Sequence, residues 1–184
     1  MDRLSAAVKY FSLLALCFLT RLVPHLPNVE PIMAAQTPAA RRFGPLAGFG
    51  FGFFSILAYD AVTRFGVWTW ECAIVYGIIG VVSNLVFRGR QASRFGYAAY
   101  AFGAVLFYDA LTGPIFGALF NGQNFQAALA GQVPFTIYHL IGAVTFSFVV
   151  SPAIYAWLAP QTQEKSAPLG AQISEQPTVS SVTA

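Results

Sequence analysis

The sequence predicts an all-α integral membrane protein, built as a six-helix bundle with a short second helix and both termini cytoplasmic. Composition and the length of the apolar blocks support this fold class. Only 9% of the 184 residues are charged and 57% are hydrophobic, whereas soluble domains carry roughly 25% charged residues. The apolar residues form blocks long enough to cross about 30 Å of hydrocarbon, which takes about 20 residues of helix. A strongly apolar soluble helical domain is the alternative.

Five apolar blocks are long enough to cross a bilayer without help. They cover residues 5–23, 46–65, 69–87, 95–119 and 134–158. In the N-terminal region Arg3 and Lys9 come before an apolar run, as in a secretory signal. Because no cleavage site of small residues comes after it, we expect this block to be retained as a span.

A sixth segment, residues 31–43, is shorter than the others. At about 1.5 Å per residue it covers less than about 20 Å, so it is either a short crossing shielded by protein or a re-entrant hairpin. Residues 1–159 are expected to form one transmembrane domain. Residues 160–184 are polar and lack periodicity, which predicts a disordered C-terminal tail.

The basic residues predict the orientation, because cytoplasmic loops carry an excess of Lys and Arg. With six spans, eight basic residues are inside and two, Arg21 and Arg64, are outside. With five spans and an external N-terminus, the ratio is seven to three. Both arrangements orient the last four spans identically. We favour six spans with both termini cytoplasmic.

Ionisable residues inside the apolar blocks predict a site near the outer side of the membrane. Asp60 and Asp109 occupy matching stretches, SILAYDAVT and AVLFYDALT. Glu71 opens the fourth span from outside, and His139 is placed in the second turn of the sixth span. Asn28 lies in the outer loop after the first span, together with a histidine and a glutamate. Buried charges cost about 2.5–3.5 kcal/mol each in a membrane and by default mark a functional site.

Structural roles are the alternative for each acidic residue and for the histidine. Asp60 has Arg64 one turn later, and such a pair neutralises itself near a helix end. Asp109 has Thr112 or a neighbouring backbone group as a partner. His139 is as well explained by packing, and Glu71 by the helix dipole.

Aromatic and small residues also have two interpretations. Trp68 and Trp70 lie where an interfacial aromatic belt is expected, or else form a pocket wall. Gly44, Gly48 and Gly52 are spaced four apart, which lets helices approach closely in lipid. That approach serves either packing within the chain or docking of a partner protein.

Several kinds of chemistry lack their motifs in this sequence. No glycine is followed by lysine, so a P-loop is excluded. Neither the His-Glu-x-x-His motif nor the Gly-x-Ser-x-Gly elbow occurs. Two cysteines at unrelated spacing predict neither a disulfide framework nor a zinc site. We therefore expect no catalytic residue, metal or cofactor and no nucleic-acid partner, and we favour binding or passage of a small solute.

The order of several loose motifs resembles a known family. The loop RLVPHLPNVEP contains Pro-Asn-x-x-Pro, a glycine-rich span ending in Tyr-Asp follows, and then GVWTW. The last span opens with QVPFTIYHLIG and ends at Ser-Pro. Over about residues 5–158 this pattern resembles the substrate-binding S components of energy-coupling-factor (ECF) vitamin transporters.

The resemblance implies a six-helix protein of a prokaryotic inner or plasma membrane that captures a vitamin-sized substrate at the outer face. It also implies partner subunits, a transmembrane coupling protein and two ATPases. The binding loops would be residues 24–31, 66–71 and 121–133. The Ala-x-x-x-Ala docking motif that many members carry on the first span is missing there, and the same spacing occurs at Ala35 and Ala39 on the second segment.

We therefore expect a membrane-embedded S component that binds a vitamin or vitamin-like molecule. Hydrogen bonds to the substrate come from the polar members of the site and apolar walls from its aromatic members, as in other small-molecule pockets. The predicted substrate-binding residues are Asn28, Asp60, Trp68, Trp70, Glu71, Asp109, Tyr138 and His139.

Two other functional classes remain as alternatives. A non-transporting membrane scaffold, for example in envelope assembly, would bind a protein partner and no small ligand. A small membrane enzyme would use the two aspartates as a carboxylate pair. Within the leading hypothesis, Cys72 next to Glu71 is a minor candidate for ligating the cobalt of a corrinoid substrate.

Overall fold

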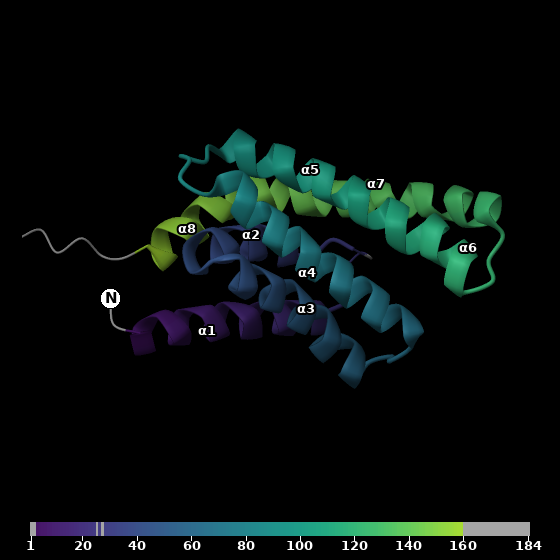
Figure 1. Cartoon of the computed structure of the whole chain (residues 1–184), viewed down its shortest axis with the longest axis horizontal. Helices are drawn as coiled ribbons and strands as arrows, with labels where there is room; N and C mark the ends of the chain where they lie inside the picture. Colours follow the sequence, from purple (N-terminus) through teal and green to yellow (C-terminus); the bar gives the residue numbers. More distant parts are fainter. Residues whose placement is uncertain (1–2, 25, 27, 160–184) are drawn as a thin grey trace, which may run out of the picture.

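A computed structural model describes residues 3–24, 26 and 28–159, and the regular structure in this part of the chain is entirely helical. The helices pack side by side as an elongated bundle (Figure 1). In chain order the elements are α1 Arg3–Leu22, α2 Ile32–Phe43, α3 Pro45–Val62, α4 Val67–Phe87, α5 Arg94–Ala110, the π-helix η1 Leu111–Ile115, α6 Phe116–Phe120, α7 Phe125–Val149 and α8 Ser151–Leu158.

Five helical segments are long and apolar enough to cross a membrane, judged by length and composition. Four of them agree closely with the predicted spans: Leu4–Leu22, Pro45–Val62, Val67–Phe87 and Arg94–Phe120. The all-helical fold is therefore confirmed for the described residues, with five helices long and apolar enough to cross a membrane. The count of six spans and the orientation of the termini stay predictions. The predicted disorder of residues 160–184 lies outside the described residues.

The predicted bounds of the last span, 134–158, are wrong. The helix α7 starts at Phe125 and ends at Val149, and a separate short helix, α8, follows. Pro134 lies inside α7, because a membrane helix tolerates proline where its neighbours satisfy the freed backbone groups. Most of the predicted binding loop 121–133 is therefore helical, and His139 lies near the middle of α7 instead of in a second turn.

The short helix α2 is enclosed by the rest of the bundle. Every residue from Ile32 to Ala40 is buried, and at 12 residues the helix is about 18 Å long. Gln36 donates from Nε2 to the carbonyls of Gly48, at 3.0 Å, and Tyr76, at 2.7 Å. Ser151 donates to the carbonyl of Ala34 at 2.8 Å. Segment 31–43 is thus a protein-shielded helix that holds α3, α4 and α8 through polar contacts.

The glycines of α3 serve packing within the chain. A Cβ at Gly48 would lie 2.5 Å from the Ala40 Cβ and 2.6 Å from the Gly80 carbonyl oxygen. A Cβ at Gly52 would lie 2.7 Å from the Tyr76 carbonyl oxygen. The α3 backbone therefore touches both α2 and α4, and docking of a partner protein at Gly48 and Gly52 is the wrong interpretation.

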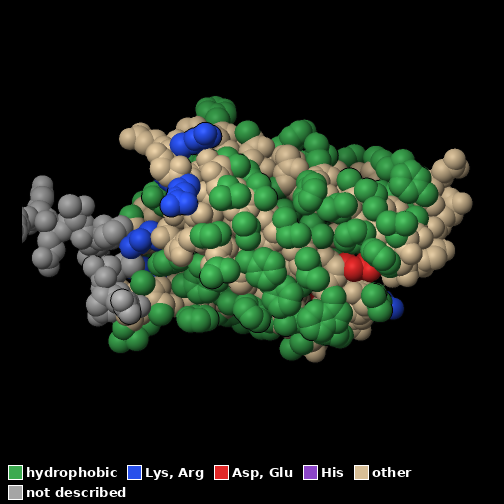
Figure 2. All heavy atoms as spheres, in the orientation of Figure 1, with side chains coloured by type: hydrophobic (Ala, Val, Ile, Leu, Met, Phe, Trp, Pro, Cys, Tyr) green, Lys and Arg blue, Asp and Glu red, His purple; other side chains and the backbone are tan. Residues whose placement is uncertain are grey.

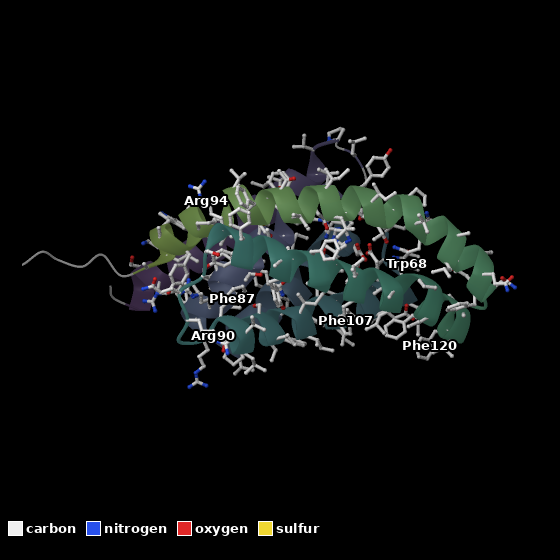
Figure 3. All side chains as sticks on the ribbon, turned by 90° about the horizontal axis from the view of Figure 1, so that it is seen from above. Trp68, Phe87, Arg90, Arg94, Phe107 and Phe120 are labelled. Atoms are coloured by element: carbon white, nitrogen blue, oxygen red, sulfur yellow. The ribbon has the colours of Figure 1, made fainter. Side chains whose placement is uncertain are left out.

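Basic residues gather at the end of the molecule where α1 begins and α8 ends (Figure 2). Lys9 donates to the Trp157 carbonyl at 2.6 Å, and Arg42 donates to the Leu158 carbonyl at 3.1 Å. Arg41 contacts the Arg90 carbonyl and donates to the Tyr97 hydroxyl at 3.0 Å. We call this the basic end, defined by Lys9, Arg41, Arg42 and Arg90. Figure 3 shows Arg90 and Arg94 at this end and Trp68 and Phe120 toward the opposite one, the far end.

Candidate functional site

Three helices bring a tyrosine, a histidine and an aspartate together inside the bundle. Nδ1 of His139 on α7 lies 2.9 Å from Oδ1 of Asp109 on α5. Nε2 of the same ring lies 3.3 Å from the hydroxyl of Tyr76 on α4. Each of these three residues is at most 2% exposed. We call them the buried polar chain.

One arrangement of protons satisfies the histidine. Nδ1–H of His139 donates to Asp109, and Nε2 accepts the hydroxyl proton of Tyr76, since a neutral imidazole has one donor and one acceptor nitrogen. The Tyr108 ring stands edge-on to the imidazole, with the ring centroids 5.7 Å apart. The ring of His139 is therefore fixed by contacts from both α4 and α5.

Asp109 keeps one oxygen without a hydrogen-bond partner. Its Oδ2 is buried and unpaired within the described residues. Thr112 donates to the Tyr108 carbonyl at 2.9 Å, so the predicted alternative of an Asp109–Thr112 bond is wrong. Asp109 also lines a cavity of about 270 Å³ between α5 and α7. An unpaired buried carboxylate oxygen costs free energy, which makes this position a candidate for ligand contact.

Asp60 lies in a different hydrogen-bonded group. It accepts a bond of 2.7 Å from the hydroxyl of Thr69 on α4, and the Thr69 hydroxyl also accepts the backbone N–H of Gly66. Arg64 lies over the Trp68 ring, 6.0 Å from its centroid, so the alternative in which Arg64 neutralises Asp60 is wrong. Asp60 thus joins the end of α3 to the start of α4, and no hydrogen bond links it to the buried polar chain.

The loop between α1 and α2 folds into the bundle. Glu30 is buried, and its carboxylate pairs with Arg21 of α1 at 2.6 Å. A Cβ at Gly142 would lie 2.8 Å from the Cα of Val29, so this glycine lets the loop approach the middle of α7. Asn28 has a positive φ of 61°, and its Nδ2 is buried without a partner in the described structure.

A polar cavity of about 350 Å³ lies beside this loop. Its walls include Arg21, Asn28, Glu30 and Tyr59. The Arg21 guanidinium lies 3.9 Å from the centre of the Tyr59 ring, which holds it against α3. The histidine of this loop, at position 25, lies outside the described residues.

The aromatic members of the predicted site lie on the surface of the bundle. Trp68, Trp70 and Tyr138 are 43%, 47% and 43% exposed, and none of them lines the cavity at Asp109 or the one at Arg21. Trp68 and Trp70 have the exposure expected of an aromatic belt. Glu71 lies 3.4 Å from Nδ2 of Asn121, a contact between the start of α4 and the end of α6.

A third cavity, of about 540 Å³, lies toward the far end of the bundle. It lies between η1 and the first half of α7, and its walls carry the amides of Gln123, Asn124 and Gln132. Gln132 also borders the cavity at Asp109. Most of the residues from 121 to 133 that line these cavities therefore belong to the helix α7.

The structure brings together Asp109 and His139 among the predicted residues and places the other six elsewhere. Sequence reasoning missed Tyr76, because a tyrosine inside an apolar helix gives no signal of its partner. It also left Arg21 out of the site, although an arginine and a glutamate flanking one loop are a usable sign of an ion pair. In the described chain no three His, Cys, Asp or Glu side chains group as metal ligands. No family model, no curated protein and no solved structure matches the chain.

Proposed function

We propose that this chain is the membrane-embedded substrate-binding component of an ECF-type transporter and captures a vitamin or vitamin-like molecule at the outer face for uptake. The observation that carries the proposal is the buried polar chain Tyr76–His139–Asp109, which leaves Asp109 Oδ2 unpaired beside a cavity. In this proposal the far end is the outer end and the protein is a multi-pass protein of a prokaryotic plasma membrane.

The burial of Tyr76, His139 and Asp109 is difficult to explain by folding alone. Helices in lipid pack well through small residues, and α3 and α4 do so through Gly48 and Gly80. An aspartate and a histidine in the same bundle cost free energy that apolar side chains of similar size would not. Ligand binding gives a reason for keeping them, because a few polar anchors inside an apolar site fix the orientation of a small molecule.

Cavity size also supports a small solute. Ligand pockets usually measure about 300–1,000 Å³. The cavities at Arg21 and toward the far end, of about 350 and 540 Å³, fall within this range, and the cavity at Asp109, of about 270 Å³, lies just below it. Because the sequence has no P-loop, ATP hydrolysis would come from partner subunits, a coupling protein and ATPases. The buried Arg21–Glu30 pair is a second polar anchor in the half of the bundle where α1 ends.

Ligand-dependent thermal stabilisation tests the proposal. The protein is purified into nanodiscs, and its unfolding midpoint is measured against a panel of vitamins and their precursors, since a ligand that binds the folded state raises the midpoint. We expect one compound to stabilise the wild type and Asp109→Ala to abolish that shift. Asn84→Ala is the matched control, because Asn84 is also buried and hydrogen-bonded, to the Ala40 carbonyl, away from the buried polar chain.

Two results would contradict the proposal. If the Asp109→Ala variant binds the best compound as tightly as wild type, Asp109 is not part of the site. A panel without any stabilising compound, together with copurification of a partner that is not an ATPase, favours the scaffold hypothesis instead.

A further inference from the structure

A cleft on the side of the bundle combines an apolar rim with a polar floor. It lies between α5 with η1 and the first half of α7 and measures about 270 Å³. The rim is formed by Leu106, Leu129, Val133 and Ile137, which are 41–55% exposed. The floor is Asp109, which is 2% exposed, with Gln132 and Thr136, which are half-buried.

The apolar and exposed rim fits a cleft that opens toward lipid. Both α5–α6 and α7 belong to segments long and apolar enough to span a membrane, and the cleft lies beside the middle of the first segment and the first half of the second. Apolar side chains that are exposed at this depth face hydrocarbon. A molecule dissolved in the bilayer therefore reaches the cleft without passing either end of the bundle, and contact with the buried Oδ2 of Asp109 takes a small movement of the side chains around it.

The floor needs a hydrogen-bond donor. Oδ1 of Asp109 accepts the N–H of His139, whereas Oδ2 has no donor within the described chain. The π-helix η1 begins two residues after Asp109, and π-helical turns occur frequently at functional sites. A carboxylate oxygen in an apolar cleft is stabilised by a ligand that donates an N–H or O–H group to it.

We propose that this lateral cleft binds an amphipathic small molecule from the lipid phase, with its hydrocarbon or ring body on the rim and an N–H or O–H headgroup at Asp109. The inference rests on the proposed function, since it names the substrate class for the same aspartate. It assigns to the substrate a route through the membrane, between α5 and α7.

A second lateral groove supplies a control. It lies between α4 and α5, measures about 360 Å³, and is lined by Ile78, Val82, Ala99, Gly103 and Phe107 among others, without an acidic residue. Ala99 there and Ala110 in the lateral cleft are both exposed alanines on α5. Ala110→Phe fills the lateral cleft without removing the buried polar chain, and Ala99→Phe makes the same change in the other groove.

The probes are two ligands of equal chain length. Decylamine carries N–H donors, and decyltrimethylammonium carries the same charge without a donor. Binding is measured by thermal shift in nanodiscs at probe levels well below the lipid concentration. We expect decylamine to stabilise wild type and Ala99→Phe, and its apparent affinity to fall about ten-fold or more in Asp109→Asn and in Ala110→Phe. Decyltrimethylammonium is expected to give no shift.

Other outcomes overturn the inference. Equal shifts with both probes, or decylamine binding that survives Ala110→Phe, exclude a donor-specific site in this cleft. Cross-linking of Val133→Cys between two copies would show that a second chain covers the cleft. If a vitamin binds in an Asp109-dependent way while decylamine does not, the inference fails and the proposed function stands. If decylamine binds and no vitamin does, the proposed transporter function fails, whereas the cleft is still a binding site for an amphipathic molecule.

Discussion

His139 of α7 and Asp109 of α5 meet at 2.9 Å between Nδ1 and Oδ1, with side-chain exposures of 3% and 2%. This contact lies between two helices that together form one side of the bundle (Figure 1). Tyr76 extends it to α4 through the other ring nitrogen. The pair therefore connects the α5–α7 half of the molecule to its centre, and its loss is expected to affect both binding and stability.

Removal of either partner should destabilise the protein, and removal of the histidine should cost more. His139→Ala leaves a buried carboxylate without its partner, which typically costs about 3–5 kcal/mol. Asp109→Ala leaves a neutral imidazole N–H without its acceptor, and we expect a loss of about 1–3 kcal/mol in the free energy of unfolding. The double variant should lose less than the sum, with a coupling energy of about 0.5–3 kcal/mol. Urea or detergent unfolding of the four proteins measures this cycle, and additive losses would contradict it.

The Arg21–Glu30 pair should behave as a buried ion pair. Their side chains are 12% and 9% exposed, so Arg21→Ala leaves a largely buried carboxylate without its partner. We expect a loss of about 3–5 kcal/mol. Arg64→Ala is the control and should cost less than about 1 kcal/mol, because Arg64 is exposed and lies 6.0 Å from the Trp68 ring centroid. Equal unfolding midpoints for the two variants would show that the pair does not hold the loop.

Close packing at Gly48 gives a third prediction. Gly48→Ala puts a Cβ 2.5 Å from Ala40 and 2.6 Å from the Gly80 carbonyl, and such overpacking typically costs about 1–3 kcal/mol. Gly103→Ala is the matched control, since no atom lies within 4 Å of its added Cβ and alanine favours a helix by about 1 kcal/mol. We expect the unfolding midpoint to fall in the first variant and to stay level or rise in the second.

Thiol labelling tests the orientation. In a background with Cys17 and Cys72 replaced, single cysteines are placed at Gln91, in the α4–α5 loop near Arg90, and at Gln123, between α6 and α7. A membrane-impermeant maleimide should label Gln123→Cys in intact cells and Gln91→Cys only in inverted vesicles, as the positive-inside rule requires. The reverse pattern would place the basic end outside.

The sequence predicted the first four long helices within a few residues, because apolar blocks of about 20 residues have few alternatives in lipid. It misplaced the last one. The predicted span began at Pro134, a residue type that favours the first turn of a helix, but the helix already begins at Phe125. The N-terminal part of α7 contains Gln126 and Gln132, which make it less apolar than the rest of the helix.

Part of the site was predictable for a similar reason. Asp109 and His139 were expected at one depth near the outer side of the membrane, and in the structure they are bonded to each other. Asp60 was expected to lie with them, but it accepts a hydrogen bond from the nearby hydroxyl of Thr69 instead. Which donor reaches a carboxylate depends on the rotation of each helix and on the length of the side chains, over a few ångströms. The position of a residue along its own helix predicts neither of these.

The enclosure of α2 has a consequence for biogenesis. A 12-residue helix that carries Gln36, Thr37, Arg41 and Arg42 is too short and too polar to partition into lipid by itself. Gln36 finds its acceptors on α3 and α4, whereas Arg41 and Arg42 find theirs after α4, on α5 and on α8. The α2 backbone is also bridged by Ser151 of α8, near the end of the described chain. The ribosome therefore synthesises α2 before most of the helices that enclose it, and its polar contacts are complete only after α8 has emerged.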